Sequence, residues 1–191
     1  ICVPRKFRPL SSAQSRARVT TMGALLCTLL RVALNTDPER DGLVDGVLLM
    51  GGNVRGGREY AEGGFFSLEA LEAEVKADET VGVVEMPGWL LSEGVRATHR
   101  GEPIPGWMQY GDGIEESDAD DAVVRVAGRP LERERVYRIA TKVADLTNGQ
   151  SPPFAEYYAA HPEALPPKGA YVNIHAALMS FFSRNLWRRV W

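Results

Sequence analysis

Residues 48–58 bring together an apolar run, four glycines, one asparagine and two arginines. Glycine lets the backbone come close to a ligand, and arginine supplies a forked, permanently charged donor. This combination suits a phosphate or a carboxylate, so Asn53, Arg55 and Arg58 are candidate anion-binding residues. A glycine-rich connection with solvated arginines is the plainer alternative. No Gly-Lys-Ser/Thr follows, so the loop is not the lysine-containing loop that cradles nucleotide phosphates.

A second basic segment, Ser15-Arg16-Ala17-Arg18, stands just before a predicted helix start. The free amides and the positive dipole end of a helix N-terminus favour anions. A basic linker is the simpler interpretation of the segment taken alone. A helix followed directly by a strand would nevertheless allow Arg16 and Arg18 to fold beside the glycine-rich loop.

The chain shows no complete catalytic apparatus. Its histidines lack an acidic or histidine neighbour at ligand spacing, and no nucleophile elbow or His-Glu-x-x-His motif is present. The acidic stretch at 111–121 does not match a calcium-binding loop, which makes a solvated loop the better interpretation. We therefore expect no catalytic residue, no metal site and no cofactor in this chain.

Three aromatic residues lie in polar or turn-rich contexts, where a ring can stack on a planar ligand: Trp107, Tyr110 and Phe154. A chain with a binding loop and no visible chemistry would hand its ligand to another domain.

Composition is that of an ordinary globular domain, with 191 residues, 45% hydrophobic residues, 25% charged residues and a net charge of −3. Nothing global points to nucleic acid or to a membrane surface. No apolar run reaches the ~20 residues of a membrane span, so we expect a soluble protein. The first residue is Ile1 and no signal peptide is visible, which favours a fragment or a processed product.

Helical and strand patterns alternate along the whole chain, which predicts a mixed α/β domain. Residues 1–14 are expected to form a linker or arm, and Thr20-Thr21 and Ser67 are candidate helix caps. Helices are predicted from 22 and over 68–75, 89–97, 153–160 and 174–186. Strands are predicted over 44–50, 80–86, 107–110, 122–126 and 136–140, with the last two paired across a turn at Gly128-Arg129-Pro130.

The order of the motifs resembles the C-terminal domain of the 5′-nucleotidase family of metallophosphoesterases over roughly residues 14–160. The series comprises Ser15-Arg16-Ala17-Arg18, Thr21-Met22-Gly23, Gly51-Gly52-Asn53-Val54-Arg55, Phe66-Ser67-Leu68, Val83-Val84-Glu85-Met86-Pro87-Gly88, Gly106-Trp107-Met108-Gln109 and Tyr137-Arg138-Ile139-Ala140-Thr141. Number, order and spacing together carry the resemblance, because no single motif is diagnostic.

The resemblance implies a layered α/β/β/α-type domain with mixed sheets over residues 15–191. It also implies a partner, an N-terminal metallophosphatase domain of the same protein, which holds two divalent metals and hydrolyses the phosphate ester. The C-terminal domain supplies substrate specificity, and a hinge rotation brings the bound nucleotide to the metals. In that picture the catalytic half is absent from this chain, and its own ligand is a small phosphorylated substrate.

The resemblance carries over to Arg16 and Arg55, which match arginines that contact substrate in the family. Three departures stand beside it. Met50 replaces an asparagine, Lys76-Ala77 replaces a Pro-Phe pair that stacks on the base, and residues 144–151 lack a second stacking aromatic. We therefore expect weak discrimination among nucleobases, or a phosphorylated substrate that is not a nucleotide. The competing hypothesis is a non-catalytic scaffold or interaction module that kept the fold and lost nucleotide binding.

Overall fold

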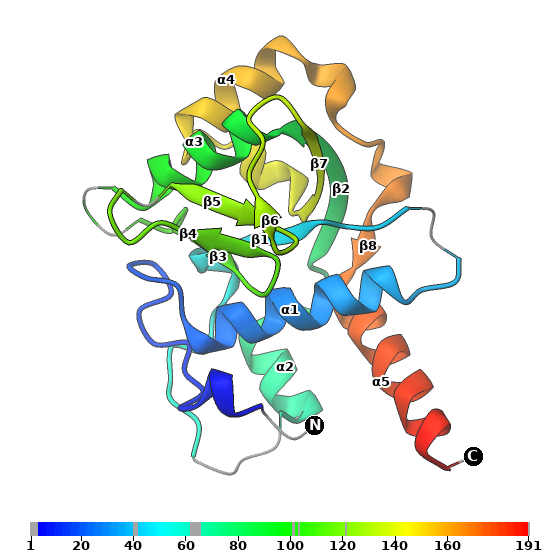
Figure 1. Cartoon of the computed structure of the whole chain (residues 1–191). Helices are drawn as coiled ribbons and strands as arrows, with labels where there is room; N and C mark the ends of the chain where they lie inside the picture. Colours follow the sequence, from blue (N-terminus) through cyan, green and yellow to red (C-terminus); the bar gives the residue numbers. More distant parts are fainter. Residues whose placement is uncertain are drawn as a thin grey trace.

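A mixed five-stranded sheet is the centre of the molecule (Figure 1). The computed structural model describes residues 4–39, 42–61, 66–100, 102, 104–120 and 122–190. Within them the strand order is β3-β1-β7-β2-β8, and β1 and β7 are parallel while the other neighbouring pairs are antiparallel. The bounds are β1 Gly46–Met50, β2 Thr80–Pro87, β3 Met108–Tyr110, β7 Val136–Thr141 and β8 Val172–Asn173.

The two faces of this sheet belong to two hydrophobic clusters. On β1, Val47 and Leu49 join the cluster formed with α1 (Thr21–Asn35), α2 (Leu68–Glu74) and α5 (Ile174–Val190). The alternate residues Leu48 and Met50 join the cluster formed with α3 (Gly88–Thr98) and α4 (Pro152–Ala160). Because successive strand side chains point to opposite faces, a strand covered on both sides reads as the continuous apolar run seen in the sequence.

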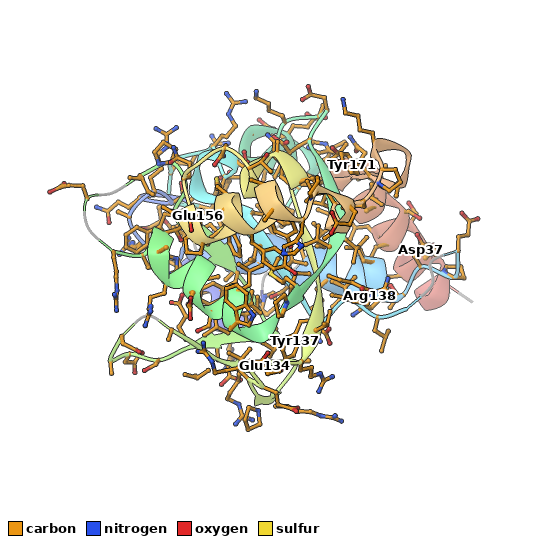
Figure 2. All side chains as sticks on the ribbon, turned by 90° about the horizontal axis from the view of Figure 1, so that it is seen from above. Asp37, Glu134, Tyr137, Arg138, Glu156 and Tyr171 are labelled. Atoms are coloured by element: carbon orange, nitrogen blue, oxygen red, sulfur yellow. The ribbon has the colours of Figure 1, made fainter. Side chains whose placement is uncertain are left out.

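Helices therefore lie on both sides of the sheet, and the predicted α/β class is confirmed. Figure 2 looks down on the α3–α4 side, with the exposed Glu156 on the outer surface of α4. The predicted caps are also present, since the side chain of Thr20 accepts from Gly23 N and that of Ser67 accepts from Ala70 N. In the part of the chain that the structure describes, no helix combines the length and apolarity needed to cross a membrane.

A smaller antiparallel sheet, β4 (Ile114–Glu116), β5 (Val123–Val126) and β6 (Arg129–Pro130), packs on the α3 side. The expected pairing of 122–126 with 136–140 is wrong. The tight turn at Ala127-Gly128, where both residues have positive φ, closes β5 onto β6. The later strand β7 instead enters the large sheet between β1 and β2. Part of the acidic stretch forms β4 rather than a loop.

From Pro4 on, the predicted arm packs onto the rest of the chain, while residues 1–3 lie outside the described residues. A short 3₁₀ helix, Arg5–Phe7, buries Phe7, and Leu10 is buried beyond it. Both side chains belong to the same cluster as α1. The Lys6 ammonium also contacts the Asp112 carboxylate, so the basic start of the chain meets the beginning of the acidic stretch.

Candidate functional site

Arg16 and Arg55, which are far apart in sequence, line the same surface hollow. The hollow has a volume of about 380 Å³ and is lined by Ser12, Gln14, Ser15, Arg16, Val54, Arg55 and Gly57. Both arginines are exposed. Across the described residues, neither guanidinium has a hydrogen-bond or ion-pair partner. Two arginine side chains thus line one cavity, and neither is paired with another of the described residues.

The glycine-rich loop leaves the sheet at the carboxyl end of β1, where the 3₁₀ turn Gly51–Asn53 follows. The turn is fixed by main-chain hydrogen bonds from Gly51 N to Trp107 O (2.7 Å) and from Gly52 N to Pro105 O (2.8 Å). Gly51 has to be glycine because a Cβ atom there would collide with the carbonyl oxygen of Ser15. The two arginine-bearing segments are therefore in direct backbone contact.

The hydroxyl of Ser15 joins these two segments. Its Oγ donates to Gly51 O at 2.9 Å and to Val54 O at 3.0 Å, and the residue is buried. The hydroxyl therefore connects Ser15, the residue before Arg16, to Gly51 and Val54 on the turn that leads to Arg55. The relative position of the two arginine backbones is consequently set by the fold before any ligand arrives.

Gln109, fully buried on β3, holds the segment that carries Arg16 and Arg18. Its Oε1 accepts from Thr20 N (2.8 Å) and Thr20 Oγ1 (3.0 Å), and its Nε2 donates to Ser15 O and Arg18 O, both at 2.8 Å. The amide thus uses both its oxygen and its NH₂ group on the protein, as a buried polar side chain requires.

Arg18, Arg58 and Asn53 do not line the hollow. Arg18 borders a neighbouring one with Glu59, and Arg58 stacks over the Tyr60 ring, 5.0 Å from its centroid, facing a third. The Nδ2 of Asn53 donates to Asp145 Oδ2 at 2.6 Å. Of the five candidates, the structure brings together Arg16 and Arg55. The anion-binding role remains a proposal for all five.

Asp145 is a residue that the sequence analysis did not single out. It follows β7 in the 3₁₀ turn Val143–Leu146 and is buried. Burial raises its pKa from 3.8 to about 6, although the Lys142 charge and the hydrogen bond from Asn53 lower it. The signal for this contact is the parallel pairing of β1 and β7, which brings both carboxyl ends to one sheet edge, and that pairing was not visible in the sequence.

The three aromatic candidates contact other protein side chains, and Trp107 and Tyr110 are half-buried. Phe154 is fully buried, and Tyr110 donates to Glu116 Oε2 at 2.7 Å. Trp107 stacks on the buried His99 ring, with centroids 4.7 Å apart. None of the hollow's lining residues in the described part of the chain is aromatic. The arrangement therefore offers charge and backbone to a ligand, but no stacking surface.

No three His, Cys, Asp or Glu side chains converge to hold a metal ion in the described ranges. The ring nitrogens of two histidines contact other protein groups. His99 contacts Met108 O and the Glu116 carboxylate, and His175 contacts Val75 O. The lining of the hollow offers two arginines, serine hydroxyls and main-chain groups.

No protein-family model and no curated protein matches this sequence. Solved structures do. The 5′-nucleotidase precursor from Thermus thermophilus superposes with a TM-score of 0.61 and 16% identity, over 89% of this chain and 34% of that one. The NAD nucleotidase of Haemophilus influenzae gives 0.55 and 12%, over 84% and 28%. This chain thus spans about a third of the length of the structures it matches. Such a likeness shows the fold, and the fold of this chain is 5′-nucleotidase-like.

Proposed function

We propose that this chain is the substrate-recognition domain of a 5′-nucleotidase-like metallophosphoesterase, and that the hollow between Arg16 and Arg55 binds the phosphate of a monoester substrate. The placement of both arginines on the lining of one hollow carries the proposal. The shared fold with two nucleotidases supports it, as does the motif series of a C-terminal domain.

Phosphate fits this hollow better than a carboxylate does. A phosphate monoester near neutral pH carries up to two negative charges and several acceptor oxygens, so it can take one guanidinium fork from each side. Each charge-assisted hydrogen bond contributes about 1.5–3 kcal/mol. Ser15, Gln109 and Glu74 already hold the backbones that carry Arg16 and Arg55 in place. Ligand binding therefore costs little conformational entropy for ordering the loop.

The rest of the substrate need not be a nucleobase. Base–aromatic stacking contributes ~1–3 kcal/mol per base, and the described lining residues have no ring to supply it. The proposal therefore includes weak discrimination among nucleobases, or a phosphorylated substrate of another kind.

Catalysis, in this proposal, belongs to an N-terminal metallophosphatase domain that is not in this chain. The two divalent metals implied for that domain do not fit the described residues here, because no set of three ligand side chains converges among them. The role of Arg16 and Arg55 is to bind and orient the phosphate for groups on the other domain.

The test is the binding of ribose 5-phosphate to the 191-residue chain, measured by isothermal titration calorimetry. Arg55→Ala and Arg16→Ala should each weaken binding about tenfold or more, since each removes a charge-assisted contact. Arg58→Ala is the matched control, because it removes an exposed arginine of the same loop that faces another hollow. Equal losses in all three variants would reduce the effect to net charge and overturn the proposal. So would steady hydrolysis of a phosphate monoester by the pure chain with Mg²⁺, Mn²⁺ or Zn²⁺.

A scaffold or interaction module is the second candidate function, and two observations favour it. Met50 is buried in the core, and the Asn53 amide is used by Asp145, so neither replaces the expected asparagine contact. Under this alternative, the wild-type chain and Arg55→Ala should show the same absence of ribose 5-phosphate binding.

A further inference from the structure

Glu74 is a fully buried carboxyl directly behind the glycine-rich loop. It is the last residue of α2, and its side chain accepts three hydrogen bonds. Oε2 accepts from Gly56 N at 2.9 Å, while Oε1 accepts from Ser12 Oγ at 2.8 Å and from Tyr60 OH at 2.6 Å. Its main-chain oxygen also accepts from Arg55 N at 2.9 Å.

The three donors come from segments that frame the hollow. Gly56 follows Arg55, and Ser12 is itself a lining residue on the segment that leads to Arg16. Ser12 is tied to the loop a second time, because its main-chain N–H donates to Arg58 O at 2.9 Å. The Glu74 carboxylate therefore connects the two segments that form the walls of the hollow, residues 12–16 and residues 54–57.

The contact is also close enough to restrict the loop sequence. A Cβ atom on Gly56 would collide with the carboxylate of Glu74, so a larger residue there would displace this carboxylate from its position behind the loop. On the far side, Tyr60 OH accepts from Arg58 Nε at 3.3 Å, and burial together with the hydrogen bond to Glu74 raises the pKa of Tyr60.

We propose that Glu74 is a positioning residue for anion binding: its carboxylate fixes the backbone of residues 55–58 against Ser12, so that Arg55 lines the same hollow as Arg16. The inference rests on the proposed function, because it assigns a purpose to the geometry of that same hollow. Glu74 has no contact with the anion itself. It acts through hydrogen bonds to Gly56, Ser12 and Tyr60.

This role predicts a particular tolerance. Glutamine at position 74 can turn its oxygen toward Gly56 N–H, which only donates, and its NH₂ toward the two hydroxyls, which can rotate to accept. Ser12 can then donate to Arg58 O, which already lies 3.3 Å from its Oγ. Alanine leaves Gly56 N–H without this acceptor and removes the carboxylate that Ser12 and Tyr60 share, so that the two hydroxyls keep only their hydrogen bonds to Arg58. Because the native negative charge opposes anion binding, a positioning role gives Glu74→Gln an affinity equal to or above that of the wild type.

The experiment measures the dissociation constant for ribose 5-phosphate and the melting temperature of Glu74→Ala, Glu74→Gln and the control Glu72→Ala, an exposed acid on the same helix. Loss of loop order should weaken binding by Glu74→Ala about tenfold, whereas Glu74→Gln should stay within about threefold of the wild type or bind more tightly. Glu72→Ala should change neither quantity. Amide exchange at Gly56 should accelerate in Glu74→Ala and stay slow in Glu74→Gln.

The outcomes separate this inference from the proposed function. If Arg55→Ala weakens binding and folded Glu74→Ala does not, the positioning role is overturned while the phosphate site stands. If Glu74→Gln loses affinity as Glu74→Ala does, the charge and not the hydrogen-bond pattern is what matters, and the inference fails. If Glu74→Ala does not fold, Tyr60→Phe removes one of the three donors and should weaken binding about two- to threefold. An unchanged affinity in Tyr60→Phe would then count against the inference.

Discussion

Each of the two arginine-bearing walls of the hollow is hydrogen-bonded to a buried side chain. The two buried side chains differ in whether they can donate as well as accept. Beneath Arg16 lies Gln109, whose amide both donates and accepts. Beneath Arg55 lies Glu74, whose carboxylate only accepts. The segment before α1 presents carbonyl oxygens as well as an N–H, whereas the glycine-rich loop and its neighbours present donors. The donors and acceptors of Gln109 and of Glu74 therefore match the groups that each side chain contacts. The two side chains are consequently not interchangeable.

The largest effect should come from exchanging one support for the other type. In Gln109→Glu, carboxylate oxygens would face the carbonyls of Ser15 and Arg18, which have lost their donor. We expect a loss of roughly 3 kcal/mol or more in the free energy of unfolding, measured by urea denaturation. The reverse exchange, Glu74→Gln, should cost less than about 1 kcal/mol because both hydroxyls can reorient. Equal losses in the two variants would contradict the comparison.

A buried carboxyl with fewer donors than Glu74 should show a pH-dependent cost. Asp145 has a folded pKa of about 6, against an ordinary value of 3.8, so folding favours its protonated form. That stabilisation is complete below pH 3.8 and is lost as the pH rises through about 6. Asp145→Asn should remove this dependence, which amounts to roughly 3 kcal/mol at most.

The measurement is urea unfolding of the wild type and Asp145→Asn at about pH 4 and about pH 7, on either side of the raised pKa. The stability of the variant relative to the wild type should rise between these two values. The exposed Asp118→Asn serves as the control and should show no such rise. A constant difference across the pH range would mean that Asp145 does not titrate in this window.

A smaller effect is expected from the bond between the two walls. Ser15→Ala removes a hydroxyl that donates to both Gly51 O and Val54 O. The free energy of unfolding should fall by about 1 kcal/mol, and ribose 5-phosphate affinity should fall several-fold as the walls lose their register. Ser183→Ala on the exposed side of α5 is the control. Weaker stability with unchanged affinity would show that the bond holds the fold without setting the site.

The smallest difference should be between ligands. Since no described lining residue is aromatic, AMP and ribose 5-phosphate should bind with dissociation constants within about threefold of one another. Competition calorimetry on the same protein measures this ratio. A strong preference for AMP would contradict this expectation and would point to a ring such as Trp107 or Tyr110 as the stacking surface.

Much of the fold was accessible from the sequence because its signals are local. The apolar run at 46–50, the stripe of α1 and the caps Thr20 and Ser67 each depend on a few neighbouring residues. Strand pairing is not local, which is why β5 and β7 were wrongly joined. The turn between them satisfied a hairpin pattern, whereas the partners of β7 lie far upstream in the chain.

The residues of the candidate site also fall into two groups, those with a local signal in the sequence and those without one. Arginine and glycine types marked a binding loop, and the motif resemblance selected Arg16 and Arg55, which do border one hollow. Periodicity gave no information on Gln109 or Glu74, because each is a polar residue inside an ordinary strand or helix pattern. The contact of Asn53 with Asp145 was not foreseen, since it arises only through the parallel pairing of β1 and β7.

The crystal structure of the chain with ribose 5-phosphate is the most direct test of whether Arg16 and Arg55 grip one anion. The account predicts a single phosphate group within hydrogen-bond distance of both guanidinium groups, above the Ser15 hydroxyl bridge. A phosphate bound by Arg18 or Arg58 instead, or two arginines that turn away from a common ligand, would contradict it.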